Sequence, residues 1–143
     1  MLAYGHPSRA TTDVDGELRD GVRTLKEFLS GHGIPANLGQ SLSGWSVAAM
    51  PPGYRERATV FINEPGLRVT LLAPVDFIIA KLRRGTDEDL EDAAWIALRY
   101  HTNAQQVRDA ADAALAASLE DTALFLFERT VDRFCADLNR PAS

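Results

Sequence analysis

The chain has 143 residues, of which 45% are hydrophobic and 24% are charged, and these proportions are typical of one globular domain. No apolar run approaches the roughly 20 residues of a membrane-spanning helix, and the start shows no secretory signal pattern, so we expect a cytoplasmic protein. The single cysteine, Cys135, excludes an internal disulfide framework and a cysteine-based zinc site.

The formal net charge of −5 is unevenly distributed along the chain. Residues 1–72 carry seven Lys or Arg and seven Asp or Glu, whereas residues 73–143 carry eight and thirteen, so the whole excess lies in the second half. Affinity for nucleic acid depends largely on neutralising phosphates with basic side chains. The acidic balance therefore argues against bulk nucleic-acid binding.

The first half of the chain predicts strands and one helix. Residues 9–14 predict a short strand that ends at Asp15 and Gly16. Residues 17–30 carry leucine and valine at helical spacing and are followed by glycines, which indicates an amphipathic helix. Residues 34–54 are rich in Gly, Ser and Pro and predict a loop, with a short strand at residues 45–48.

A hairpin and a run of helices follow. The β-branched segments 57–62 and 67–72 flank a turn signature at residues 63–66. After it the pattern is helical: one helix over residues 74–84, a second begun by a capping box of Thr86 and Asp89, a third from Asn103 to Ala117, and a last one capped by Ser118 and Asp121. We predict an α+β fold, a single domain over residues 1–143 with a sheet and helix in 1–72 and helices in 73–143.

The most specific chemical feature is the pair Asp13 and Asp15. Side chains two residues apart on a strand project from the same face, where two carboxylates repel unless a cation neutralises them. Carboxylate pairs suit Mg²⁺, whose coordination is usually completed by phosphate oxygens of a substrate. The alternative is that both residues simply suit a strand-to-turn junction.

Three segments together resemble the minimal nucleotidyltransferase-like families that include relatives of the AbiEii-type toxin. Residues 9–15 resemble the R-x-T-x-D-hydrophobic-D motif, residues 72–84 are similar to the L-x-P-x-D-hydrophobic-K-L element, and residues 87–92 resemble the acidic segment that follows it. The resemblance implies a small mixed nucleotidyltransferase-type sheet and transfer of NMP from a nucleoside triphosphate. It also implies a toxin–antitoxin or defence context, with a cognate antitoxin or another protein as partner.

The same resemblance implies roles for individual residues. Asp13 and Asp15 correspond to the catalytic carboxylates that hold Mg²⁺, while Arg9, Thr11 and Lys81 correspond to nucleotide-binding positions. From the residues alone, Lys81 has a second interpretation, a lysine whose stem lies along a buried helix without binding phosphate. The acidic side chains of 87–92 are likewise explained by the favourable field at a helix N-terminus.

Two departures from the family pattern open an alternative function. The glycine pair that holds the triphosphate in active members has no counterpart in residues 1–5, although a longer natural chain would restore it. The expected place of a third carboxylate, residues 67–72, offers Arg68 and Thr70. The alternative is a catalytically inactive nucleotidyltransferase fold that acts as a binding or interaction module.

The missing first strand of the family fold also leads to an oligomer prediction. Without that strand, residues 9–15 would expose unpaired backbone groups, which proteins rarely leave bare. A second copy of the chain, the 34–54 loop or aggregation would cover them. The C-terminal helix with Phe125, Phe127 and Phe134 is either core or a dimer seam. We predict a homodimer, the commonest oligomer.

Overall fold

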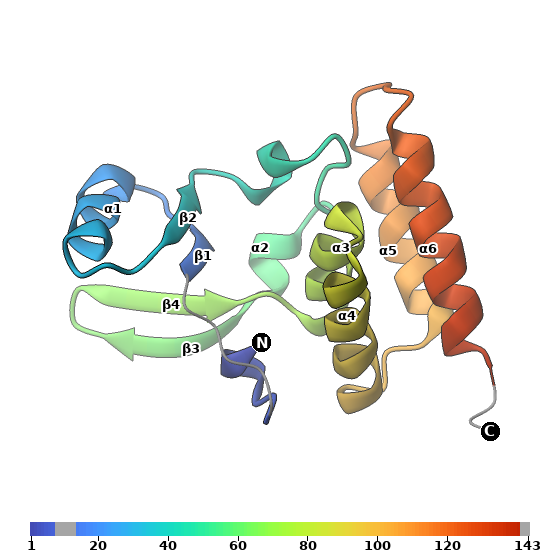
Figure 1. Ribbon diagram of the computed structural model, residues 1–143, viewed down its shortest axis with the longest axis horizontal. Coiled ribbons are helices and arrows are strands. Elements are labelled where there is room, and N and C mark those ends of the chain that lie inside the picture. Colours follow the sequence, from blue (N-terminus) through green and yellow to red (C-terminus); the bar gives the residue numbers. More distant parts are fainter. Residues whose placement is uncertain (8–13, 141–143) are drawn as a thin grey trace. The chain divides into compact units, whose positions relative to one another are not determined.

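The computed structural model describes residues 1–7 and 14–140, which fall into two compact units, Met1–Trp45 and Ser46–Ser143 (Figure 1). The first unit has a parallel pair of strands, β1 (Val14–Glu17) and β2 (Ala36–Gly39), joined by helix α1 (Val22–Gly31). Parallel strands need such a crossover, because a tight turn cannot return the chain in the same direction. Short 3₁₀ turns at Leu2–Tyr4 and Leu42–Trp45 complete this unit.

Several boundaries in this unit differ from the sequence prediction. The predicted strand at 9–14 overlaps the described chain only at its end, and β1 runs from Val14 to Glu17. Helix α1 begins at Val22, not at residue 17, because β1 continues through Glu17 and Gly21 takes a left-handed conformation just before the helix. The predicted strand at 45–48 is wrong, since a 3₁₀ turn ends at Trp45, and the loop instead contributes β2 at residues 36–39.

The pairing of β1 bears on the argument for a homodimer. Residues 36–39 lie beside β1 in parallel register, with Asp15 opposite Asn37. One of the three expected covers, the 34–54 segment, is therefore present along one edge of β1. The homodimer itself stays a prediction.

The second unit begins with a short helix and a hairpin. Helix α2 (Tyr54–Arg57) leads into β3 (Thr59–Glu64), which pairs antiparallel with β4 (Leu67–Leu71). The predicted hairpin is confirmed, with Gly66 at φ 80° in the turn, while its first strand starts two residues late because Arg57 closes α2. Within the described residues the four strands form two separate two-stranded sheets.

Four helices make up the rest of the second unit: α3 (Pro74–Arg84), α4 (Asp87–Arg99), α5 (Ala104–Ala116) and α6 (Leu124–Leu138). Helix α3 packs against all three others, and α5 runs beside α6 (Figure 1). Five of their aliphatic side chains are almost fully buried: Ile78, Ile79, Leu82, Ile96 and Val107. The predicted α+β class with a helical C-terminal half is confirmed.

Local capping explains most of the helix boundaries. The capping box at Thr86 is present as predicted, and Asn103 forms a second one with Gln106. The prediction that Ser118 caps the last helix is wrong: α6 begins at Leu124, and the Ser118 hydroxyl instead donates to Ala114 O and accepts from Ala49 N. The sequence pattern could not show that a distant loop would occupy this hydroxyl.

Gly85, between α3 and α4, provides a test of this connection. Its φ is 68°, and a Cβ there would lie 3.4 Å from Leu82 O and from Thr130 Cγ2. We expect Gly85→Ala to lower the free energy of unfolding by about 1–2 kcal/mol, because left-handed backbone disfavours a Cβ. Gly31→Ala, in a helix with open space around the new Cβ, should be neutral or stabilising. Urea unfolding measures both, and equal stability of the two variants would contradict the expectation.

Candidate functional site

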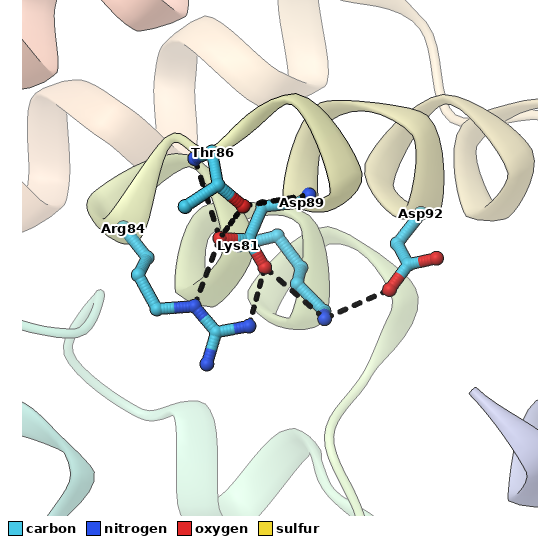
Figure 2. A network of polar contacts seen from close by, with 5 residues as sticks. All are labelled: Lys81, Arg84, Thr86, Asp89 and Asp92. Atoms are coloured by element: carbon cyan, nitrogen blue, oxygen red, sulfur yellow. Dashed lines mark hydrogen bonds and ion pairs between the residues drawn. The ribbon is translucent and has the colours of Figure 1, made fainter. Parts of the chain in front are cut away.

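The helices α3 and α4 meet in a network of charged side chains (Figure 2). Lys81 Nζ lies 2.8 Å from Asp92 Oδ2 and 3.2 Å from Asp89 Oδ1. On the other side of Asp89, Arg84 donates from Nε to Oδ2 at 2.8 Å and from Nη2 to Oδ1. Lys81 of α3 thus contacts both carboxylates of α4, and Arg84 of α3 contacts Asp89.

Asp89 is the centre of this network. Its side chain is 0% exposed, and its Oδ2 also accepts from the Thr86 hydroxyl at 2.7 Å and from the Thr86 backbone N–H at 3.3 Å. Burial by itself raises the pKa of Asp89, yet the hydrogen bonds from Arg84, Thr86 and Lys81 and the charge of Arg84 outweigh it and hold that pKa well below its usual range. Asp89 is therefore a buried, fully ionised carboxylate.

The position of the network follows from the local sequence. Gly85 in its left-handed conformation ends α3 and reverses the chain, so the last turn of α3 faces the first turn of α4. Cations are favoured at a helix C-terminus and carboxylates at an N-terminus, because of the partial charges on the unpaired backbone groups there. Lys81 and Arg84 therefore sit where α3 favours positive charge, and Asp89 sits where α4 favours negative charge.

The surroundings of Lys81 are largely buried and carry opposite charge. Its side chain is only 18% exposed, Nζ lies 5.5 Å from the centre of the Phe77 ring, and both of its carboxylate partners are buried. This burial agrees with a lysine whose stem lies along a buried helix, and its charge is balanced by the two carboxylates. A role for Lys81 in nucleotide binding stays a prediction.

The acidic segment 87–92 divides into two groups. Asp89 and Asp92 are buried and face α3, whereas Asp87, Glu88 and Glu91 are exposed. On the same helix the apolar residue Ala94 is exposed. Two aspartates belong to the buried face instead, because Lys81 and Arg84 supply the compensating charges.

The predicted metal pair is only partly within the described residues. Asp15 lies on β1 and is exposed, whereas Arg9, Thr11 and Asp13 lie outside the described residues. A Cβ at the neighbouring Gly16 would contact buried Leu38, so Asp15 projects from the opposite face of the strand. The carboxylate of Asp15 is thus open to a ligand.

The donor type at Asp15 suits a hard cation. A carboxylate oxygen is the ligand that Mg²⁺ prefers, and this ion usually takes one or two carboxylates and completes its shell with water and phosphate. In the part of the chain that the structure describes, no three His, Cys, Asp or Glu side chains gather as a metal cage. Any Mg²⁺ at Asp15 would therefore depend on further oxygens, such as those of Asp13 and a nucleotide.

A second buried charge pair was missed by the sequence analysis. Asp76, in the first turn of α3, is 0% exposed and accepts two hydrogen bonds from Arg57, from Nε at 2.9 Å and from Nη2 at 2.7 Å. The hydrogen bond with Asp76 raises the pKa of Arg57. A signal was available, since Asp76 stands on the apolar face of α3 and needs a cation nearby.

Residues 67–72, the expected place of a third carboxylate, include strand β4. Strand β4 carries Arg68 and Thr70 there and pairs antiparallel with β3. Phe127 and Phe134 of the C-terminal helix are buried, while Phe125 is 58% exposed. One face of that helix thus belongs to the core, and Phe125 lies on its exposed face.

The ionised state of Asp89 leads to a pH prediction. A carboxylate with a depressed pKa in the folded state adds stability that is complete above its unfolded pKa of roughly 4 and is lost as the pH falls below it. We expect the free energy of unfolding to drop between about pH 4 and pH 2. Asp89→Asn should flatten this part of the profile, and Asp87→Asn, at an exposed position, should leave it unchanged. Urea unfolding at each pH tests this, and an unchanged slope in Asp89→Asn would contradict it.

No helix in the described part of the chain has the length and apolar character needed to cross a membrane. Among known proteins, the model of one family matches residues 1–134, and that family is described as a nucleotidyltransferase of unknown function (DUF6036). Searches of curated proteins and of solved structures found no match. Since the match covers nearly the whole chain and includes all three motifs, the chain belongs to this nucleotidyltransferase family.

Proposed function

We propose that the protein binds a nucleoside triphosphate with Mg²⁺ and transfers NMP from it to an acceptor. In this proposal Asp13 and Asp15 hold the metal and act as the catalytic carboxylates, and Arg9, Thr11 and Lys81 contact the nucleotide. The observation that carries the proposal is the family match over residues 1–134, within which Asp15 presents an open carboxylate on β1.

This reaction requires little covalent chemistry from the side chains of the protein. An acceptor hydroxyl attacks the α-phosphorus and loses its proton to water, and pyrophosphate leaves as the bond between the α-phosphorus and the oxygen that bridges to the β-phosphate breaks. Bound Mg²⁺ supplies charge neutralisation on the phosphates. The task of the residues is to position the triphosphate and to offset its charge, which is how most phosphoryl-transfer sites accelerate their reactions.

The biological setting proposed here is a toxin–antitoxin or defence system, in which a cognate antitoxin or another protein would be the partner. Its only support is the resemblance of residues 9–15 and 72–92 to the AbiEii-type relatives. We also propose that the protein forms a homodimer. Light scattering at micromolar concentration tests it against the single-chain mass of 15.6 kDa.

The second candidate function is an inactive member of the family that serves as a binding or interaction module. The observation that favours it is the commitment of Lys81 to Asp89 and Asp92, at 3.2 and 2.8 Å. A lysine whose charge is already balanced by two carboxylates offers less to a phosphate than a free one. The two candidates differ in turnover, since only the first releases pyrophosphate.

The metal role of Asp15 leads to a binding test. We expect Asp15→Asn to weaken Mg²⁺-dependent binding of ATP or GTP at least tenfold, because an amide oxygen lacks the charge that a divalent cation requires. Asp112→Asn, which changes an exposed aspartate of α5, is the matched control. Calorimetric titration measures affinity, and α-labelled nucleotide measures transfer. Binding without transfer would favour the inactive candidate, and equal affinity of wild type and Asp15→Asn would remove Asp15 from the site.

Lys81 leads to a separate stability test. Lys81→Met preserves most of the aliphatic stem but leaves Asp92 without this cation and Asp89 with Arg84 as its remaining cation. We expect a loss of about 3 kcal/mol in the free energy of unfolding, the lower end of the cost of breaking a buried pair. Lys26→Met, at an exposed lysine of α1, should change stability little. Similar stabilities of both variants would show that the network contributes nothing measurable.

A further inference from the structure

The second unit contains a groove of about 550 Å³ whose lining includes neither Asp15 nor Lys81. Its walls come from residues 51–57, from the start of α3, from the residues between α4 and α5, and from α5 itself. More than half of the lining residues are apolar: Pro51, Pro52, Pro74, Val75, Ala110 and Ala113. Hollows of this size with an apolar lining and a few polar groups are typical of sites for small molecules.

The charged residues of the groove give it a negative potential. Among the described lining residues, these are Arg57 and Asp109. Arg57 donates to the buried carboxylate of Asp76 from Nε at 2.9 Å and from Nη2 at 2.7 Å, so this pair contributes no net charge. The carboxylate of Asp109 therefore sets the sign of the charge in the groove, which attracts a cation and repels an anion.

The Asp109 carboxylate is exposed and can accept a further hydrogen bond. In the part of the chain that the structure describes, its contact is with Gln105, whose Nε2 donates to Oδ1 at 2.7 Å. The neighbouring cation Arg108 pairs instead with Asp132 of α6, at 2.7 Å. No described cation thus balances the charge of Asp109, and its Oδ2 remains available to a ligand.

The surroundings of Asp109 provide space and an aromatic surface. Gln106, Asp109, Ala110 and Ala113 all line the groove, and their spacing of three or four residues places them on one face of α5. The short alanine side chains leave room beside the carboxylate. Tyr100, which is 43% exposed, also lines the groove, and aromatic rings attract cations through the negative charge of their faces.

The donor set favours an organic cation over a metal ion. Hard divalent ions take several oxygen ligands, whereas Asp109 is the one carboxylate of the described lining, and the described residues contain no cluster of three metal-ligating side chains. A primary ammonium carries a single positive charge, which one carboxylate can neutralise through a charge-assisted hydrogen bond. An apolar body attached to it would cover the proline and alanine walls and remove them from water.

We propose that this groove binds a small primary amine in its protonated form, with the ammonium group on Asp109 and the apolar body against the prolines and the α5 alanines. The proposal goes beyond nucleotide binding, because it assigns a ligand class to a surface that Asp15 and Lys81 do not line. Its test uses no nucleotide, so its result does not depend on the proposed transfer activity.

The test is an NMR titration of the full chain at neutral pH with isopentylamine. Isopentyl alcohol and isovalerate are its neutral and anionic counterparts with the same branched body. We expect the amide signals of Thr102, Gln106 and Ala110 to shift saturably with the amine at a Kd of about 1–10 mM. The alcohol and the anion should bind at least about tenfold more weakly, because neither carries the charge that Asp109 attracts.

Two variants test whether Asp109 is the anchor. Asp109→Asn keeps an oxygen that can accept from Gln105 but removes the charge, and we expect it to weaken binding of the amine about tenfold. Asp112→Asn removes the same charge at an exposed position of the same helix outside the groove, and it should bind as the wild type does.

Three results would each overturn the proposal. The first is the absence of saturable shifts up to about 30 mM amine. The second is equal affinity for the amine and the alcohol, which would remove the ammonium group from the recognition. The third is equal weakening in Asp109→Asn and Asp112→Asn, which would leave only a general effect of net charge.

Discussion

A buried carboxylate, that of Asp89, governs the arrangement of the helical half of the molecule. An ionised group without access to water is costly unless charged and hydrogen-bonding partners surround it. Asp89 has such partners only when Arg84 and Lys81 of α3 meet Thr86 and the first turn of α4. The observed register between the two helices completes this set of partners, and in that register α3 also packs against α5 and α6.

The ion pairs of the buried carboxylates affect how a functional role of Lys81 can be tested. In the described part of the second unit, each of the three buried carboxylates has a cation at hydrogen-bonding distance: Asp89 has Arg84 and Lys81, Asp92 has Lys81, and Asp76 has Arg57. The lysine that resembles a nucleotide ligand thus also maintains the fold, so loss of activity on its replacement cannot by itself identify a nucleotide contact. Stability and affinity have to be measured on the same variants.

Part of the site could be predicted from the sequence and part could not. Motif spacing identified the family, and it named Asp15 and Lys81 as candidates. The partners of Lys81, and the pair of Asp76 with Arg57, were missed because a helical pattern can place an aspartate on the apolar face, as it does Asp76, but does not name the cation that pairs with it. Only the approach of a second element tells whether a charge will be buried and paired, and Arg57 lies 19 residues before Asp76 in the chain.

The sequence by itself determined the α+β class, the hairpin, the helix α3 from Pro74 to Arg84, the capping box at Thr86 and the start of a helix at Asn103, because turn chemistry, period and capping act over a few neighbouring residues. The tertiary structure decided that residues 36–39 pair with β1, that Ser118 bonds to Ala49, and that Asp76, Asp89 and Asp92 are buried. These features depend on groups far apart in the chain, and their energies arise only when folding removes water from between them.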